Sequence, residues 1–170
     1  MTNTAGETGP LTAKYRMLAI ITLVTVVADQ ATKQVILVTM ALHETIEVIP
    51  GFFSLTHIHN PGGAFGFMAG QPQGVRTVLF LVVSTLAAVF VLYLYKTTPR
   101  TLPWLLGALA LIFGGAVGNL IDRIRFGVVV DFLDFYVKGL HWPAFNMADS
   151  AITVGMTVLV FHILFKKVPF

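Results

Sequence analysis

Long apolar runs alternate with short polar segments along this chain, and the runs have the length of membrane spans. A helix needs about 20 predominantly apolar residues to cross a bilayer. We expect helices over residues 15–38, 75–95, 102–130 and 146–165. A polar segment at residues 29–34 interrupts the first run, but apolar sequence resumes beyond it. The alternative for its first half is a signal peptide cleaved after Ala28.

Residues 43–67, which we call the flap, have a different pattern. Polar and apolar residues alternate in T-I-E-V-I and S-L-T-H-I-H, and turn residues follow at Pro50-Gly51 and from Asn60 to Gly63. This pattern predicts short strands joined by turns, outside the membrane. We interpret the flap as a segment that closes over a substrate. Its aromatic residues are Phe52, Phe53, Phe65 and Phe67. Residues 134–143 are expected to form a short amphipathic excursion between the third and fourth helices.

The composition agrees with a membrane protein. Mean hydropathy is +0.82 and only 11% of residues are charged, against roughly 25% in soluble domains. We therefore expect an all-α integral membrane protein with one domain over residues 1–170, preceded by a disordered tail at residues 1–13. The net charge of +3 comes without a basic cluster, which argues against nucleic-acid binding. The absence of cysteine excludes disulfides, thiolate nucleophiles and cysteine-bound metals.

The distribution of charge predicts the orientation. The N-terminus, the loop at residues 96–100 and the C-terminus carry six basic residues and one acid, Glu7. The other side carries five basic residues and seven acids. Cytoplasmic loops are enriched in Lys and Arg. Both termini are therefore predicted to be cytoplasmic, with the flap and the excursion facing outward.

Two acids, Asp131 and Asp149, stand where apolar runs meet the excursion. Two carboxylates about 4 Å apart repel each other by roughly 4 kcal/mol at an effective dielectric constant of about 20. One then stays protonated near neutrality while the other stays ionised, as peptide hydrolysis by activated water requires. The structural alternative is that Asp131 and Asp134 solvate a helix end, while Asp149 sits at N3 of a helix capped by Asn146.

Other polar residues suggest support for such a site. Asp29 and Lys33 are spaced i, i+4 and can pair on one helical face, either to fix helix packing or to support a polar site. Gly114 and Gly118 form a G-x-x-x-G pair that permits close helix approach. Asn119 and Arg123 share a face, and we expect Asp122 to neutralise Arg123. Asn60 and Gly62 belong either to a plain turn or to a loop that lines a substrate groove.

Other chemistries find less support. The sequence contains no G-x-S-x-G or H-E-x-x-H motif, and His57 and His59 lack an obvious third ligand. We expect no metal and no cofactor, and we interpret His162 as structural. Two other functions stay open. One is a small proton-coupled transporter that uses Asp29, Asp131 and Asp149 as a relay; the other is an assembly factor that binds helices through the glycine face.

The motifs occur together in one order that resembles the lipoprotein signal peptidase (signal peptidase II) family of bacterial inner-membrane aspartyl peptidases. They are D-x-x-x-K at residues 29–33, N-P-G-G-A-F-G at 60–66, G-G-A-x-G-N-x-x-D-R at 114–123, V-V-D-F at 129–132 and F-N-x-A-D at 145–149.

This resemblance implies that Asp131 and Asp149 are the catalytic pair. Asn60, Gly62, Asn119, Arg123 and Asn146 would surround the substrate, with Asp29 and Lys33 supporting the site. The implied partners are membrane lipid and a diacylglyceryl-modified prolipoprotein, cut on the amino side of its lipid-bearing cysteine. The resemblance also implies inhibition by globomycin-type antibiotics. We expect a monomer whose active site lies near the extracytoplasmic face.

Overall fold

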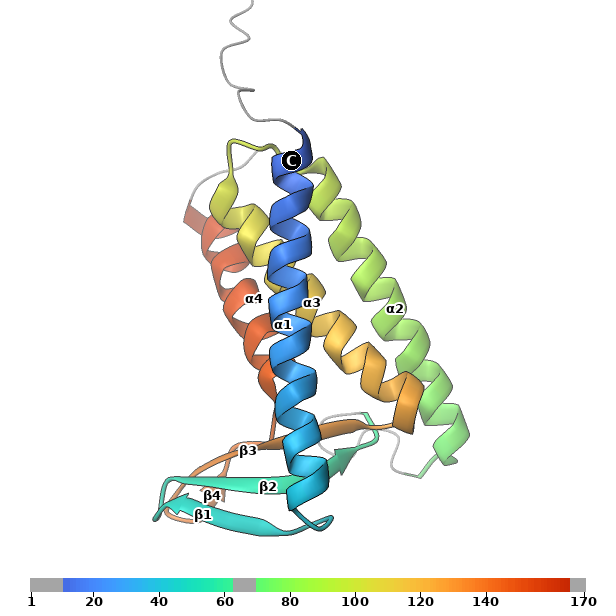
Figure 1. Cartoon of the computed structure of the whole chain (residues 1–170), viewed down its shortest axis with the longest axis vertical. Helices are drawn as coiled ribbons and strands as arrows, with labels where there is room; N and C mark the ends of the chain where they lie inside the picture. Colours follow the sequence, from blue (N-terminus) through green and yellow to red (C-terminus); the bar gives the residue numbers. More distant parts are fainter. Residues whose placement is uncertain (1–10, 63–69, 166–170) are drawn as a thin grey trace, which may run out of the picture.

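The computed structural model describes residues 11–62 and 70–165, which form a helical bundle with a small sheet at one end (Figure 1). The helices are α1 (Leu11–Thr39), α2 (Gln73–Thr97), α3 (Pro103–Phe126) and α4 (Met147–Phe165). The strands are β1 (Thr45–Ile49), β2 (Phe53–Asn60), β3 (Val129–Val137) and β4 (Leu140–His141).

All four helices are long and apolar enough to cross a membrane, which confirms the predicted class. α1 runs without a break through Ala28, so a single helix accommodates both halves of the interrupted apolar run. It begins at Leu11, earlier than expected. The last three residues of the predicted disordered tail are therefore helical, and residues 1–10 lie outside the described part of the chain.

α3 lies at the centre of the bundle and contacts α1, α2 and α4. Two glycines make the contact with α1 close. A Cβ atom on Gly114 would lie 2.9 Å from Cβ of Thr25, and one on Gly118 would lie 2.6 Å from Oδ2 of Asp29. The G-x-x-x-G pair thus brings the backbone of α3 against the polar face of α1, as the sequence predicts.

The predicted third helix is too long. α3 ends at Phe126, because Gly127 adopts a left-handed conformation (φ 73°) and donates its amide hydrogen to the carbonyl of Arg123 at 3.0 Å. Three successive β-branched valines follow, and they favour a strand. The predicted excursion at residues 134–143 therefore contains the end of β3 and the whole of β4.

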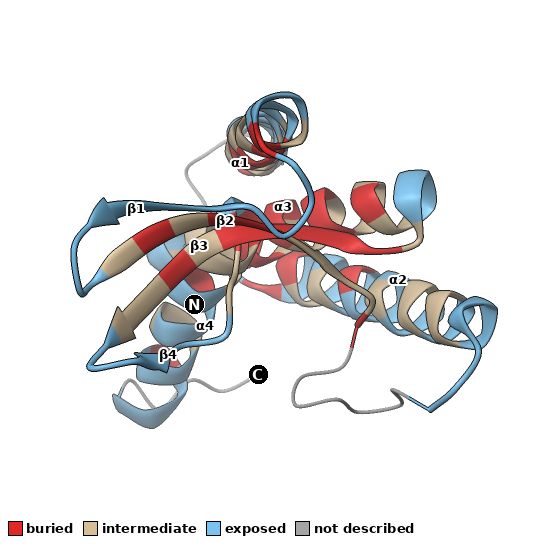
Figure 2. Cartoon of the chain, turned by 90° about the horizontal axis from the view of Figure 1, so that it is seen from below, coloured by how far each residue is buried: buried red, intermediate tan, exposed pale blue. Residues whose placement is uncertain are grey.

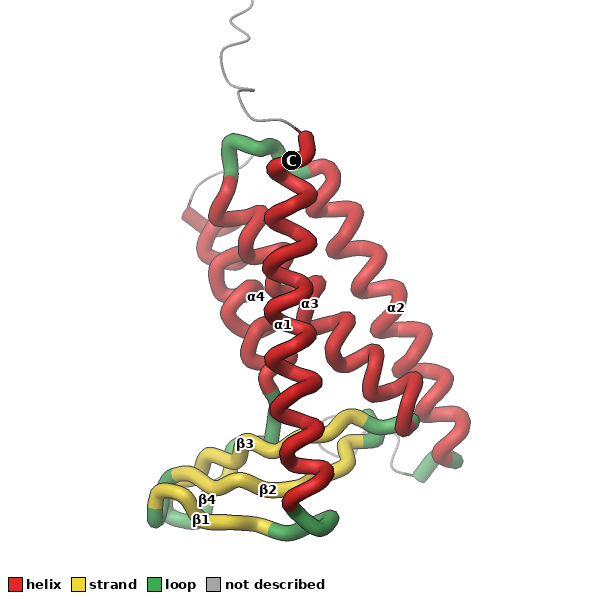
Figure 3. The backbone as a smooth tube through the Cα atoms, in the orientation of Figure 1, coloured by secondary structure: helices red, strands yellow, loops and turns green. Residues whose placement is uncertain are grey.

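The flap and this segment form one antiparallel sheet in the order β1-β2-β3-β4 (Figure 2). The sheet lies at one end of the four helices (Figure 3). Strands are observed within the flap as predicted, although residues 63–67, including Phe65 and Phe67, lie outside the described residues. Val130 and Phe132 pack against Ile36 and Met40 near the end of α1. Figure 2, which views the molecule from below, shows the buried part of β3 in front of the helices and β1 exposed at the margin. The sheet is therefore attached to the bundle through β3.

The beginning of α1, the loop between α2 and α3 and the end of α4 gather at the other end of the bundle (Figure 1). There, Nζ of Lys14 donates hydrogen bonds to the carbonyl oxygens of Lys96 and Thr98 at 2.9 and 2.7 Å. The Tyr95 hydroxyl donates to the carbonyl of Lys14 at 2.6 Å. These bonds tie the start of α1 to the end of α2.

Candidate active site

Asp131 lies on β3 at the junction of sheet and bundle, and its side chain is only 2% exposed. Each of its oxygens accepts a hydrogen bond from an amide side chain. Nδ2 of Asn146 donates to Oδ1 at 2.7 Å, and Nδ2 of Asn60 donates to Oδ2 at 2.9 Å. Asp131 is therefore a strand residue held from two sides, and not the solvated end of a helix.

A β-bulge in β2 aims Asn60 at Asp131. Leu55 pairs with Leu133, but the register shifts before Ile58 pairs with Asp131. Side chains alternate between the faces of a strand, and an extra residue reverses which positions face which side. Because of the bulge, Ile58 and Asn60 share the face of Asp131. Without it, Asn60 would point to the opposite face.

Gly62 fixes which end of the Asn60 amide faces Asp131. Its backbone N–H donates to Oδ1 of Asn60 at 2.9 Å, which leaves Nδ2 free to donate to the carboxylate. Gly62 has φ 94°, and a Cβ atom here would overlap the ring of Phe80 on α2. The site therefore requires glycine at this position for both conformation and space.

Asp149 lies in the first turn of α4 and forms a reciprocal cap with Asn146. The Asp149 amide donates to Oδ1 of Asn146 at 2.9 Å, and the Asn146 amide donates to Oδ2 of Asp149 at 3.3 Å. This is the predicted capping arrangement. Asn119 on α3 donates from Nδ2 to the remaining carboxylate oxygen of Asp149 at 2.7 Å.

The structure thus brings Asp131 and Asp149 together around Asn146. This fully buried residue donates its side-chain amide to Asp131 and its backbone amide to Asp149. The pKa of Asp131 is raised to about 7, because burial and the charge of Asp149 outweigh the opposing effects of the hydrogen bonds from Asn60 and Asn146 and the charge of Lys33. A carboxyl group with this pKa can hold a proton near neutral pH beside a second carboxylate.

Asp29 and Lys33 pair as predicted, with Nζ of Lys33 2.9 Å from Oδ2 of Asp29. The same Nζ lies 2.8 Å from Oδ2 of Asp122 and donates to Oδ1 of Asn119 at 3.0 Å. Asp122 thus forms its salt bridge with Lys33, whereas the sequence suggested its neighbour Arg123 as the partner. Asp29, Lys33 and Asp122 are all buried, and we call them the buried charge cluster.

Arg123 lies in the last turn of α3, near the two aspartates. Its Nη1 donates to the carbonyl oxygen of Asn119 at 3.4 Å. Its guanidinium interacts electrostatically with the carboxylates of Asp149, Asp131 and Asp122. The side chain of Arg123 is half-buried.

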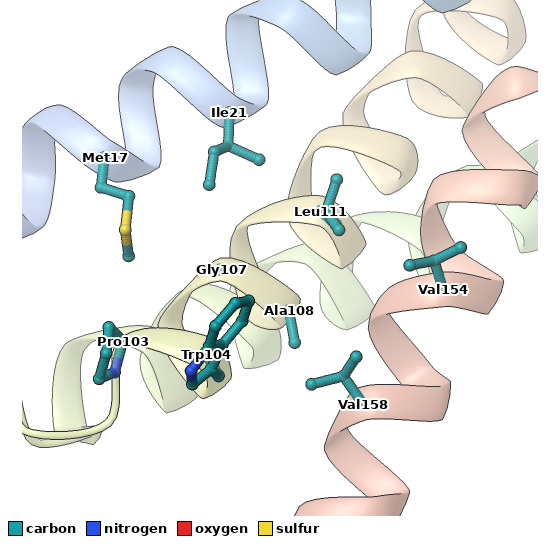
Figure 4. Close-up of a pocket in the computed structure, with 9 residues that line it drawn as sticks. All are labelled: Met17, Ile21, Pro103, Trp104, Gly107, Ala108, Leu111, Val154 and Val158. Atoms are coloured by element: carbon teal, nitrogen blue, oxygen red, sulfur yellow. The ribbon is translucent and has the colours of Figure 1, made fainter.

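Two other features bear on the possible chemistry. Nε2 of His57 and Nε2 of His59 are 3.3 Å apart on β2, but the described residues contain no group of three or more His, Asp or Glu side chains placed to hold a metal. A cavity of about 580 Å³ lies between α1, α3 and α4, lined by apolar residues including Met17, Trp104 and Val158 (Figure 4). It contains none of the polar residues described above.

Comparison with known proteins confirms the family resemblance. A family model described as signal peptidase (SPase) II matches residues 21–165. A lipoprotein signal peptidase of Desulforapulum autotrophicum is 58% identical over 152 residues, which cover 89% of this chain and 94% of that protein. The corresponding protein of Syntrophus aciditrophicus is 49% identical over 140 residues, covering 82% and 86%.

The fold leads to the same assignment. A solved structure described as a bacterial membrane enzyme superposes with a TM-score of 0.77 at 33% sequence identity, covering 86% of this chain and 87% of that one. The family model spans all four helices and the sheet, apart from the beginning of α1. The chain therefore belongs to the signal peptidase II family of bacterial membrane peptidases.

Proposed function

We propose that this chain is an aspartic endopeptidase that removes the signal peptide from diacylglyceryl-modified prolipoproteins, cutting on the amino side of the lipid-bearing cysteine. Family membership supports the peptidase activity and the lipoprotein substrate. The observation that carries the aspartic mechanism is that Asn146 is hydrogen-bonded to both Asp131 and Asp149. This arrangement favours a peptidase over a proton relay, which needs ionisable groups spread across the membrane.

In this mechanism one proton is shared by the two carboxyl groups. The ionised carboxylate takes a proton from a water molecule, whose oxygen attacks the scissile carbonyl. The protonated carboxyl group donates its proton to the carbonyl oxygen, which gives a neutral tetrahedral intermediate. When the C–N bond breaks, the amine leaving group takes a proton from the pair, and a hydroxyl group of the intermediate returns one to the pair as the new carboxyl group forms. The pair returns to its starting state, and no covalent enzyme intermediate forms.

The amide side chains keep both carboxyl groups oriented during these transfers. Asn60 and Asn146 hold the two oxygens of Asp131, while Asn119 holds one oxygen of Asp149. Arg123 would provide a positive charge at the edge of the pair, where a developing negative charge on the substrate carbonyl is stabilised. Asp29 and Lys33 lie behind Asn119 and Asn146 as support. Every group that the mechanism uses is supplied by one chain, so we expect the monomer to be active.

The location of the pair suits a lipid-modified substrate. Both aspartates lie where the helices meet the sheet, and the charge distribution supports an extracytoplasmic position for this end of the molecule. Large apolar side chains of the sheet are exposed there, including Phe52, Leu140 and Trp142. Aromatic residues are typical of the membrane–water interface. A signal peptide entering as a membrane helix would present its cleavage site at this depth, with its acyl chains in lipid.

The test uses purified protein in detergent micelles with a precursor that carries diacylglyceryl-cysteine, and with the same precursor lacking lipid. We expect two products, whose masses place the cut before the modified cysteine, and no cleavage of the unmodified precursor. A globomycin-type inhibitor should abolish the reaction. Equal cleavage of both precursors, or a cut at another bond, would contradict the proposed substrate.

A further inference from the structure

Each of the two aspartates follows a residue whose backbone amide is bound by a buried carboxylate. The amide of Ala148, which precedes Asp149, donates to Oδ1 of Asp29 at 2.9 Å. The amide of Val130, which precedes Asp131, donates to Oδ2 of Asp122 at 3.1 Å. The two members of the aspartate pair are thus tethered in the same way, although one lies on a helix and the other on a strand.

The two tethering carboxylates are themselves joined. Nζ of Lys33 bridges Oδ2 of Asp29 and Oδ2 of Asp122 at 2.9 and 2.8 Å. Nε2 of Gln30 bridges the same carboxylates at 3.1 and 2.9 Å and also donates to the carbonyl of Gly118 at 3.2 Å. Four successive contacts, through Asp29, Lys33 and Asp122, therefore connect the backbone beside Asp149 to the backbone beside Asp131.

Stability alone does not account for this arrangement. Buried ion pairs contribute little compared with apolar residues of the same volume, because their desolvation offsets their attraction. Two carboxylates around one lysine leave a net negative charge inside the bundle, which adds to that cost. The geometric consequence, however, is specific. Lys33 on α1 holds Asp29 and Asp122, and these two carboxylates bind the backbone amides of Ala148 and Val130. Hydrolysis by paired carboxyl groups depends on their separation, and errors of about 1 Å in placement can reduce rates about 10²-fold.

We propose that Asp122 and Gln30 are positioning residues, which together with Asp29 and Lys33 set the separation of Asp131 and Asp149 by holding the amides of Val130 and Ala148. The inference rests on the proposed catalytic role of the two aspartates. Asp122 and Gln30 touch neither substrate nor water in this role. They act through the backbone that carries the reacting groups.

The main test compares Asp122→Asn with Asp134→Asn. Asp134 lies three residues beyond Asp131 on β3 and pairs with His141, outside the buried charge cluster. In Asp122→Asn we expect kcat to fall about 10–100-fold while KM changes less than about threefold, and amide exchange of Val130 to accelerate. Asp134→Asn should keep the parent kcat and the parent exchange at Val130.

The pH profile separates positioning from a general loss of structure. Neutralising Asp122 leaves the charge of Lys33 less compensated, and this charge lowers the pKa of Asp131. The basic limb of kcat/KM should therefore move to lower pH in Asp122→Asn and stay in place in Asp134→Asn. A variant that is merely less stable would have a lower kcat/KM at every pH, but kcat/KM would begin to decrease at the same pH as in the parent.

If Asp122→Asn does not fold, Gln30→Met provides the test. This substitution removes the hydrogen bonds from Gln30 to Asp29 and Asp122 without leaving an unpaired buried charge. We expect kcat to fall about 3–10-fold at unchanged KM, with no change in Gln34→Met, an exposed position on the same helix. Parent-like kcat in either folded Asp122→Asn or Gln30→Met, or a loss confined to KM, overturns the inference. The proposed function fails separately, if Asp131→Asn still cleaves the precursor.

Discussion

Asn146 donates a 2.7 Å hydrogen bond from Nδ2 to Oδ1 of Asp131 while its Oδ1 caps α4 by accepting the amide hydrogen of Asp149. The two sequence interpretations of Asp149, a helix-capping residue and a member of a reactive pair, are therefore compatible. The cap places the Asp149 carboxylate at the start of the helix, and the same asparagine points its donor at the second carboxyl group. We propose that the helix cap sets the position of the Asp149 carboxylate relative to that of Asp131.

The first prediction concerns the pH dependence of the reaction. The pKa of Asp131 lies at about 7 because the group is buried beside Asp149. The pair should hold its shared proton below this pH and lose it above, so kcat/KM should decrease as pH rises beyond about 7. Initial rates of precursor cleavage between about pH 5 and 9 measure this decrease in kcat/KM. A rate that is constant up to about pH 9 would contradict the assignment.

The same pKa predicts a pH-dependent stability. The pKa of Asp131 is raised from about 3.9 in the unfolded chain to about 7 in the folded protein. The folded state therefore binds an extra proton between these values, and stability is lost as pH rises through this window.

Asp131→Asn has no such proton, so its stability relative to the parent should increase from about pH 4 to 7, by up to about 4 kcal/mol. Thermal unfolding in detergent at several pH values measures the difference, and titrating groups that are not coupled to Asp131 cancel in the comparison. A difference that is independent of pH would show that Asp131 titrates normally.

A third prediction tests how Asn60 is held. In Gly62→Ala the new methyl group would overlap Phe80, and the displaced backbone would turn the Asn60 amide away from Asp131. We expect kcat/KM to fall about tenfold or more. Gly51→Ala is the matched control, because Gly51 also has positive φ (74°) but open space around it. Equal effects of the two substitutions would mean that only backbone strain matters.

Much of this site is predictable from the sequence because it depends on local spacing. The pairing of Asp29 with Lys33 follows from their i, i+4 separation on a helix, and the cap at Asn146 follows from its position three residues before Asp149. Placement of Asp131 and Asp149 at one end of the bundle follows from the number of spans. These inferences need no knowledge of how the helices are packed.

The remainder depends on long-range geometry. The contact of Asp122 with Lys33 arises from the approach of α3 to α1 at Gly118, and its neighbour Arg123 was the more obvious partner in sequence. The bulge in β2 that turns Asn60 toward Asp131 is set by pairing with β3, which itself was expected to be helical up to Val130. Glycine at position 127 followed by three valines is the signal that could have ended the helix earlier.

A fourth prediction concerns the end of the bundle remote from the aspartates. Lys14→Met removes the two hydrogen bonds to the carbonyls at the end of α2 and should reduce the free energy of unfolding by about 1–2 kcal/mol. Cleavage measured well below the unfolding temperature should be unchanged. Arg16→Met, two residues away and exposed, should alter neither quantity. A loss of kcat in folded Lys14→Met would show that the two ends of the bundle are coupled.

The most direct test of the central claim is a double-mutant cycle on the two aspartates. We predict that Asp131→Asn and Asp149→Asn each reduce kcat by about 10³-fold or more in folded protein, and that the double variant is no worse than either single one, because the pair acts as a unit. Residual turnover within about tenfold of the parent in either single variant, or losses that multiply in the double variant, would contradict a shared proton between Asp131 and Asp149.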